Sequence, residues 1–418
     1  MRSTQLTYRG IAGLAGAVAL ISQLALSTDV LAQGCVAVRG GMCLLSGAQH
    51  PEGHNFEEQP WQVNLAYRWL HSDRHFVGDD EQPNRQIDGT EVINDSHFLD
   101  LTVSYQFITR YSAAFTLPTV SHHRTSFYEH TGGSPASGGV RGASGSSGIG
   151  DVRLTGYAWL WDPANMPKGN VQLGLGIKAP TGDYKAADTF YHGAARGSEL
   201  HYVDQSIQPG DGGWGFTAEM FAYREIVENV TLYAQTYYLF SPRDVNGVST
   251  TTRSPRGRTI TALNNTINSP TATAAEKATA QARLNAATAL GYNNMESLED
   301  VMSVSDQYLA RGGMTYMLWK EWGLAISLGA RLEGVPVEDV IGDSDGFRRP
   351  GYTVSIEPGI SMMKGRYTAA INAPVAMYRN RSKSVADERW DQITGVVNRC
   401  GDAAFADFLI SASFGARF

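Results

Sequence analysis

The chain has 418 residues, a net charge of −7 and only 18% charged residues, while glycine is abundant at 45 residues. This length allows one large domain or two ordinary ones, and the absence of a Lys/Arg cluster argues against nucleic acid as a partner. The mean hydropathy is −0.24, and no apolar run of about 18 residues follows the N-terminal region. Hydropathy detects membrane helices only, because a membrane strand alternates apolar and polar residues and averages to neutral.

The N-terminus has the pattern of an export signal. An apolar stretch at 11–26 follows two arginines, and Val30-Leu31-Ala32 offers a small-residue cleavage site. We therefore predict a cleaved signal peptide at 1–32 and a periplasmic segment at 33–60. An uncleaved membrane anchor and a lipoprotein attached at Cys35 remain as alternatives.

Three cysteines occur, at Cys35, Cys43 and Cys400. An exported protein meets an oxidising compartment, so Cys35 and Cys43 are candidates for a disulfide that closes a small loop. Connectivity cannot be deduced from sequence alone. No Cys/His cluster has the spacing of zinc ligands, and no metal site is predicted.

Beyond residue 60, twelve segments alternate apolar and polar residues with the period of two that is typical of a half-buried strand. The clearest one places Leu99, Leu101 and Val103 on one face and Asp100 and Thr102 on the other. The predicted strands cover 61–69, 99–107, 113–117, 152–160, 171–177, 216–222, 230–238, 310–318, 322–332, 352–360, 367–377 and 408–418. Aromatic residues suited to the headgroup level of a membrane lie near strand ends, at Trp61, Trp69, Trp159, Trp161, Trp214, Trp319, Trp322, Tyr352 and Tyr367.

Connections between these strands alternate strictly in length. The short ones are 109–110, 162–169, 227–229, 320–321 and 364–366. The long ones are 71–96, 119–149, 180–213, 241–305, 334–350 and 380–404. A soluble sandwich has no reason to segregate loop lengths, whereas a membrane barrel has short periplasmic turns and long extracellular loops. The predicted fold class is therefore all-β: a transmembrane, antiparallel, up-and-down barrel of about twelve strands at 61–418.

The chain ends on Phe418, and apolar residues occupy every second position back to Phe408. This pattern resembles the C-terminal signature of bacterial outer-membrane barrels, which the barrel assembly machinery reads. We predict that Phe414 and Phe418 form this assembly signal. The predicted location is the outer membrane of a Gram-negative cell, in contact with its lipid.

Three stretches resemble a family of outer-membrane proteins linked to a phenol-degradation meta-pathway. They are Gly148-Ile149-Gly150-Asp151-Val152-Arg153-Leu154, then Gly174-Leu175-Gly176-Ile177-Lys178-Ala179-Pro180-Thr181-Gly182-Asp183, and Glu357-Pro358-Gly359 followed by Ala373-Pro374-Val375. The resemblance covers the strands from about residue 148 onward and is absent from 241–305. It implies a channel-like, porin-like barrel, and its link to aromatic substrates is associational.

An enzymatic function finds little support. Some twelve-stranded barrels are lipid hydrolases with a His-x-Ser pair, but no histidine in this sequence is followed by serine two residues later. The nearest approach to a triad is His122-His123-Arg124, which lies between Ser121 and Ser126. A nucleophile needs a base within hydrogen-bond reach and a third orienting group. We interpret the cluster as a solvated loop end and predict neither an enzyme nor catalytic residues.

Two other motifs have simple interpretations, and no cofactor is predicted. Asp343-Ser344-Asp345-Gly346, with Asp339 upstream, lacks the closing Glu of a calcium loop and is interpreted as a polar turn. The Gly/Ser tract at 132–150 contains no P-loop Lys and is interpreted as a flexible loop.

The predicted inner face of the barrel carries charges of both signs. The positive residues are Arg68, Arg153, Lys178, Arg311, Arg331 and Arg417. The negative residues are Asp100, Asp151, Glu219, Glu333 and Glu357. They fit a passive channel or transporter for small, aromatic or hydrophobic solutes, whose passage they select. Alternatively, the charges pair across a closed lumen and the barrel is a surface scaffold or binding protein. The solute is not predicted.

The loop 241–305 contains one predicted short helix at 274–290. Ser269 is the expected cap, Pro270 suits the first turn, and Gly291 ends the helix. Its apolar face consists mostly of alanine. The sequence leaves open whether this helix is exposed, covers the barrel mouth or folds inward.

Overall fold

The computed structural model describes residues 59–418, except 133, 251–258 and 397–399. The predicted signal peptide lies outside the described residues. The same holds for nearly all of the predicted segment 33–60 and for the disulfide candidates Cys35 and Cys43. These three expectations stay predictions.

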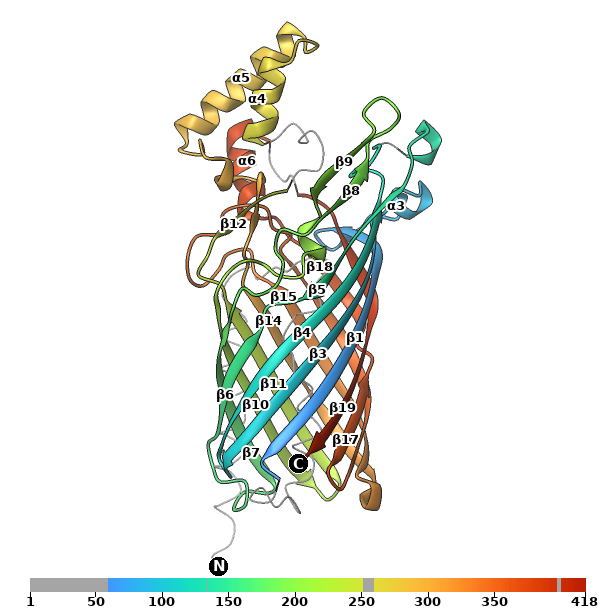
Figure 1. Ribbon diagram of the computed structural model, residues 1–418, viewed down its shortest axis with the longest axis vertical. Coiled ribbons are helices and arrows are strands. Elements are labelled where there is room, and N and C mark those ends of the chain that lie inside the picture. Colours follow the sequence, from blue (N-terminus) through green and yellow to red (C-terminus); the bar gives the residue numbers. More distant parts are fainter. Residues whose placement is uncertain (1–58, 133, 251–258, 397–399) are drawn as a thin grey trace, which may run out of the picture. The chain divides into compact units, whose positions relative to one another are not determined.

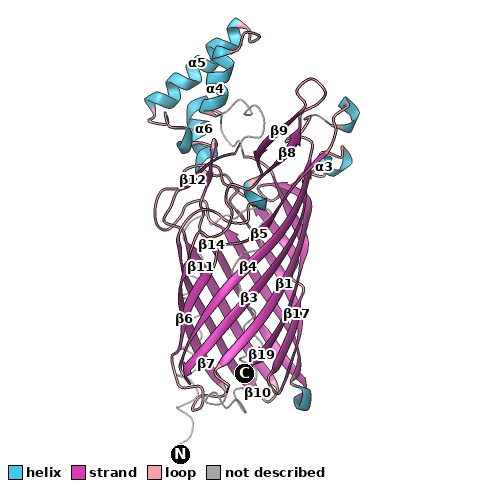
Figure 2. Cartoon of the chain, viewed as in Figure 1, coloured by secondary structure: helices cyan, strands magenta, loops and turns pink. Residues whose placement is uncertain are grey.

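Twelve antiparallel strands form a closed barrel (Figures 1 and 2), which confirms the predicted fold class. Each strand pairs with the next one along the chain, and the last pairs with the first. Two of the twelve are interrupted and are numbered in two parts. The strands are β1 (Trp61–Val77), β3 (Ile93–Ile108), β4 (Tyr111–Ser126), β5 with β6 (Gly142–Ile149 and Arg153–Trp159), β7 (Gly169–Lys178), β10 (Gly215–Val227), β11 (Val230–Phe240), β14 (Gln307–Trp319), β15 (Leu324–Val335), β16 (Gly351–Lys364), β17 with β18 (Tyr367–Asn372 and Val375–Arg381) and β19 (Ala403–Arg417).

The barrel closes where its first strand meets the end of the chain. The backbone N–H of Trp61 donates to Phe418 O at 3.1 Å, and the N–H of Phe418 donates to Trp61 O at 2.8 Å. The side chains of Phe414 and Phe418 are exposed on the outer face. This pairing continues the ladder to the last residue, and the role of both phenylalanines in assembly stays a prediction.

The barrel is apolar outside and polar inside. Leu154 is 58% exposed and Leu175 is 74% exposed, whereas Arg153 is 9% exposed and Glu357 is 2% exposed. Successive side chains of a strand point to opposite faces, so the predicted alternation places these two kinds of residue on opposite sides of the wall. A water-soluble barrel would show the reverse distribution.

Three strands near the N-terminal end extend further than predicted. β1 reaches Val77 rather than 69, β4 reaches Ser126 rather than 117, and β3 begins at Ile93 rather than 99. The extensions contain polar residues such as Asn94, which pairs with Arg124 in register. Backbone pairing continues there although the apolar alternation has stopped, which is why the period-two pattern missed these segments.

The short elements of the long connections lie at the end of the barrel opposite the tight turns (Figure 1). They are β2 (Asp80–Glu81), α3 (Asn84–Ile87), η1 (Pro135–Ser137), β8 (Ala187–Tyr191), β9 (Ser198–Tyr202), η2 (Gln205–Ile207), β12 (Val245–Ser249), η3 (Met295–Ser297) and β13 (Val301–Ser303). At the other end, η4 (Lys320–Trp322) forms one of the turns. The predicted alternation of long and short connections is therefore observed.

Three α-helices occur in the last long connections: α4 (Ile260–Asn268), α5 (Ala274–Ala289) and α6 (Val385–Thr394). The predicted helix corresponds to α5, but its N-cap is Thr273, which forms a capping box with Glu276. The expected cap, Ser269, instead ends α4. No helix in the described part of the chain is both long enough and apolar enough to cross a membrane.

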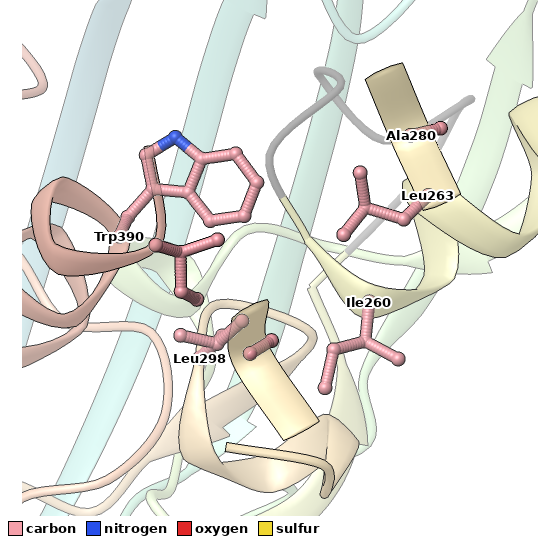
Figure 3. Packing of buried hydrophobic residues seen from close by; sticks show 7 residues of the cluster. Ile260, Leu263, Ala280, Leu298 and Trp390 are labelled. Carbon is pink, nitrogen blue, oxygen red and sulfur yellow. The ribbon is translucent and has the colours of Figure 1, made fainter. Parts of the chain in front are cut away.

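The weak apolar face of α5 is covered by its neighbours. Figure 3 shows Ile260 and Leu263 of α4, Ala280 of α5, Leu298 after η3 and Trp390 of α6 packed in one cluster. Trp390 is 2% exposed. The alanines thus obtain from two other helices the apolar contacts that α5 alone lacks. α5 therefore belongs to a helical cluster, which Figure 1 shows beyond the end of the barrel rather than inside it.

Candidate functional site

Eight charged residues on the inner face form what we call the charge belt. Its members are Arg68, Asp100, Arg153, Glu219, Arg311, Arg331, Glu333 and Glu357. Seven of them are no more than 9% exposed, and Glu219 is half-buried. All eight were predicted for this face from the period of two. Their role in solute passage stays a prediction.

One half of the belt lies on three neighbouring strands. Arg311 of β14 donates through Nη1 to Glu357 Oε1 of β16 at 2.9 Å, and through Nε to Gln235 at 2.8 Å. Arg331 of β15 donates through Nε and Nη2 to both carboxylate oxygens of Glu333, each at 2.8 Å. Its Nη1 also lies 3.9 Å from Glu357 Oε2. Two-point contacts between guanidinium and carboxylate are among the stronger hydrogen-bonded pairs in proteins.

The other half lies on β1, β3, β6 and β10. Arg68 Nη2 lies 3.3 Å from Asp100 Oδ2, and Arg153 Nη2 lies 4.0 Å from the same oxygen. Tyr157, on the inner face of β6, donates to Glu219 Oε2 of β10 at 3.0 Å. Asp100 therefore lies between two arginines.

Some belt interactions connect strands that are not neighbours in the wall. Arg68 of β1 interacts electrostatically with Arg331 and Glu333 of β15. Arg153 of β6 contacts Tyr237 of β11. In strand order, β15 is four places from β1 and β11 is three places from β6. These interactions therefore link belt residues across part of the lumen rather than only along the wall.

An aromatic layer fills the lumen on the side of the short turns. Phe221 and Tyr223 of β10 and Tyr233 of β11 are buried together, and Trp159 packs against them. The ring centroids of Trp159 lie 6.4 Å from Phe221 and 6.0 Å from Tyr223. The prediction that Trp159 lies at the headgroup level is wrong. It is out of phase with the outward Leu154 and Ala158, so the strand's alternation turns it inward.

On the side of the long loops, Lys178 binds the loop segment that contains Asp211 and Gly213. Its Nζ lies 3.0 Å from Asp151 Oδ2 and 2.5 Å from Asp211 Oδ1, and it donates to Gly213 O at 2.8 Å. Lys178 and Asp151 were predicted for the inner face, but Asp211 was not. It lies in a long connection, where no periodic pattern indicates which way a side chain points.

Two cavities lie along this path. The inner one is lined by belt residues, by Lys178 and by apolar or aromatic side chains that include Phe98, Tyr237 and Leu239. The outer one is lined by residues of η2, β13 and their flanking segments. Asp211 and Gln307 line both cavities. The segment around Asp211 thus separates a polar vestibule from an inner cavity of mixed character.

The remaining predicted lumen residue lies apart from the belt. Arg417 is half-buried near the end of β19, and in register it is opposite Gln62 of β1. This position is close to the C-terminus, on the side of the short turns.

A further buried ion pair lies among the long connections at the mouth of the barrel. Arg348 binds both carboxylate oxygens of Asp339, at 2.9 and 2.6 Å, and both side chains are fully buried. Asp306 accepts hydrogen bonds from Tyr238 and from the backbone N–H of Val340, both at 2.9 Å. Burial and the neighbouring Asp339 carboxylate raise the pKa of Asp306 to about 6. We call Asp306, Asp339 and Arg348 the mouth network.

The segment that sequence analysis interpreted as a polar turn adjoins this network. Asp345 forms an ion pair with Arg389 of α6, and the N–H of Asp343 donates to Asp244 at 2.7 Å. The Asp345 carboxylate therefore contacts an arginine, and the Asp244 carboxylate accepts from the backbone amide of Asp343.

The histidines near Ser121 form no triad with each other, and the interpretation of this cluster as a solvated loop end is wrong, because it lies within β4. His122 is buried and His123 is exposed, so they lie on opposite faces of β4. His122 Nδ1 is instead 2.9 Å from Ser96 Oγ of β3, a contact across strands that sequence spacing could not reveal. Both residues are buried on the inner face beside Phe98. The expectation that the chain is not an enzyme stays a prediction.

No family model matches the chain, and no curated protein matches it. Similar solved structures include an outer membrane channel from Pseudomonas putida F1, with 11% identity, a TM-score of 0.45, and 88% of this chain and 100% of that chain covered. The P. putida toluene transporter TodX has 9% identity and a TM-score of 0.38, with 93% of this chain and 99% of that chain covered. A Pseudomonas aeruginosa FadL homologue has 8% identity and a TM-score of 0.35, with 86% and 90% covered. At these values the similarities carry no argument about function.

Proposed function

We propose that this protein is an outer-membrane channel for small solutes, and that the charge belt closes it in the present conformation. The observation that carries the proposal is a closed barrel with an apolar outer face and a charged inner face. Buried ion pairs contribute little to stability, and apolar replacements of similar volume are often neutral or stabilising. Apolar side chains would fill a permanently closed lumen without the free-energy cost of burying charges. Eight charges on its wall fit a path that is hydrated when open.

The outer face fits a lipid environment on every side of the barrel. Large apolar side chains such as Leu175, Leu328 and Ile371 are more than half exposed. In water, so much exposed apolar surface would favour aggregation or association. We place the short turns in the periplasm and the long connections outside the cell, as in other membrane barrels.

The lining of the inner cavity supports a solute class. Phe98, Tyr237 and Leu239 offer apolar contacts, while three basic and three acidic side chains, paired with one another in part, offer polar contacts. The belt contains four arginines and four acidic residues and is therefore neutral in sum. We propose small solutes with an apolar body and one polar or charged group, a class that includes aromatic acids.

The second candidate is a barrel that stays closed and serves as a surface scaffold or binding protein. The observation that favours it is the density of the lumen. The belt charges are paired, and the aromatic layer of Trp159, Phe221, Tyr223 and Tyr233 fills the space on the side of the short turns.

Solute uptake separates the two candidates. The refolded chain is inserted into liposomes, and swelling is measured with an aromatic carboxylic acid, a polyol of similar mass and a large oligosaccharide. The channel predicts entry of the two small solutes, with the aromatic acid faster, and exclusion of the oligosaccharide. Folded barrels that admit none of the three would support the scaffold instead.

A further inference from the structure

The hairpin of β8 and β9 is a well-anchored element of the connection between β7 and β10. Phe190 packs against Val203 and Ile207, and all three side chains are fully buried. The carboxylate of Asp188 accepts a hydrogen bond from the N–H of Gly145 in β5 at 2.8 Å. The hairpin therefore holds its side chains in defined positions.

Three possible metal ligands meet on this hairpin. His192, Glu199 and His201 each offer one ligand atom, and these atoms all lie within 4.8 Å of one another. Glu199 Oε2 is 3.0 Å from His201 Nε2 and 3.9 Å from His192 Nε2. Around a tetrahedral Zn²⁺ with bonds of about 2.0–2.2 Å, ligand atoms lie roughly 3.3–3.6 Å apart. Small side-chain rotations would bring the three atoms to that spacing.

His192 provides an independent sign that a ligand belongs there. The residue is 5% exposed, and its Nε2 has no hydrogen-bond partner among the residues that the structure describes. A buried polar atom without a partner costs free energy. Nδ1 lies 3.1 Å from the carbonyl oxygen of His130, which can only accept, so Nδ1 carries the proton. The Nε2 lone pair is then available on the side of Glu199, the arrangement that a backbone carbonyl imposes on metal-binding histidines.

We propose that His192, Glu199 and His201 bind a divalent transition-metal ion, with Zn²⁺ as the best match. Two imidazole nitrogens and one carboxylate oxygen suit zinc, copper, nickel or cobalt, whereas Ca²⁺ and Mg²⁺ prefer all-oxygen sites. Arg196 also contacts Glu199, at 3.2 Å, but its side chain is 43% exposed and can move into solvent when the metal binds. Water completes the coordination.

The site is independent of the proposed channel. Its ligands lie outside the two cavities, and a metal ion would join the end of β8 to β9. The chain continues from β9 directly into η2 and the segment that lines both cavities, so bound metal would stiffen the base of that segment.

The test uses the refolded full chain without a polyhistidine tag. Zn²⁺ binding is measured by calorimetry for the wild type, His192→Ala, His201→Ala and the control His123→Ala, which removes an exposed histidine of β4. The wild type and the control are expected to bind one more Zn²⁺ per chain than the other two variants. If a weakened site remains in those variants, we expect its affinity for Zn²⁺ to fall by roughly 100-fold or more. Removing a residue that only supports a ligand costs about 10–100-fold, and removing a ligand should cost at least as much.

A second measurement tests the site in case a histidine substitution distorts the hairpin itself. Trypsin cleavage after the exposed Arg196 is followed with and without Zn²⁺, in the wild type and in Glu199→Gln, which changes a partly exposed side chain. Zn²⁺ is expected to slow cleavage only in the wild type. Equal Zn²⁺ binding by the wild type and both histidine variants would overturn the proposal. Equal protection by Zn²⁺ and Mg²⁺, or protection of Glu199→Gln by Zn²⁺, would overturn it as well.

Discussion

The charge belt and the mouth network both bury arginine–carboxylate pairs, but they are built differently. Arg311 and Glu357 lie on strands whose pairing fixes every side chain, so the period of two predicts where they point. Asp306 and Asp339 meet because two long connections fold against each other. We infer that breaking a pair in the wall lowers the stability of the whole barrel, whereas breaking a pair in the mouth lowers the stability of the loops alone.

The largest expected effect comes from breaking a belt pair. Arg311→Ala leaves the carboxylate of Glu357, which is 2% exposed, without its closest cation. Losing one partner of a buried pair costs about 3–5 kcal/mol of the free energy of unfolding. The measurement is urea unfolding in vesicles, in which heat-modifiable migration on a gel reports the fraction of folded barrel. The double variant Arg311→Ala with Glu357→Ala serves as the control and is expected to recover most of the loss. A single variant as stable as the wild type would show that the pair contributes nothing and would point to a different register in β14.

A break in the mouth network is expected to act locally. Asp339→Asn removes the negative charge opposite the fully buried Arg348. We expect a loss of about 3 kcal/mol in the free energy of loop opening, which corresponds to roughly 100-fold faster proteolysis of the loops. The unfolding midpoint of the barrel should stay unchanged. If that midpoint falls as far as in Arg311→Ala, the mouth is coupled to the wall and the contrast between the two regions fails.

The mouth should also respond to pH. Because the folded state raises the pKa of Asp306 from its usual value near 3.8 to about 6, this group favours the folded loops when it is protonated. Its contribution is complete below about pH 3.8 and is lost as the pH rises through 6, by about 3 kcal/mol for this fully buried group. Hydrogen exchange of the loops at pH 5 and pH 7.5, corrected for the intrinsic rate, measures the difference. Asp306→Asn should abolish it, and an unchanged pH dependence in that variant would assign the effect to another group.

The smallest effect is expected at an exposed pair. Lys320 and Glu228 form an ion pair at the short turns, with side chains 63% and 77% exposed. Exposed pairs are screened by water and salt, so Lys320→Ala should leave the unfolding midpoint unchanged. A loss comparable to that of Arg311→Ala would mean that burial does not explain the difference between these pairs.

Sequence reasoning succeeded where backbone geometry repeats. The alternation placed Asp100 and Arg311 on the inner face without any knowledge of their partners, because strand pairing alone fixes that orientation. The same rule, applied consistently, turns Trp159 inward, and the error there came from preferring a rule about aromatic residues at strand ends.

The sequence could not reveal contacts between loops. Asp211 approaches Lys178, and Asp339 approaches Arg348, through irregular segments whose backbone follows no period. Thr273, by contrast, was missed as a helix cap although the sequence signals it: Glu276 lies three residues later and completes a capping box, which Ser269 lacks.

The most direct test of the channel with a closed belt is single-channel conductance in planar bilayers. The wild type is compared with the double variant Arg311→Ala and Glu357→Ala, which removes two paired side chains from the lumen and leaves its net charge unchanged. We predict a larger conductance for the double variant and an unchanged reversal potential in a salt gradient. Folded barrels of both proteins that show no conductance would contradict the channel and leave the closed scaffold as the better description.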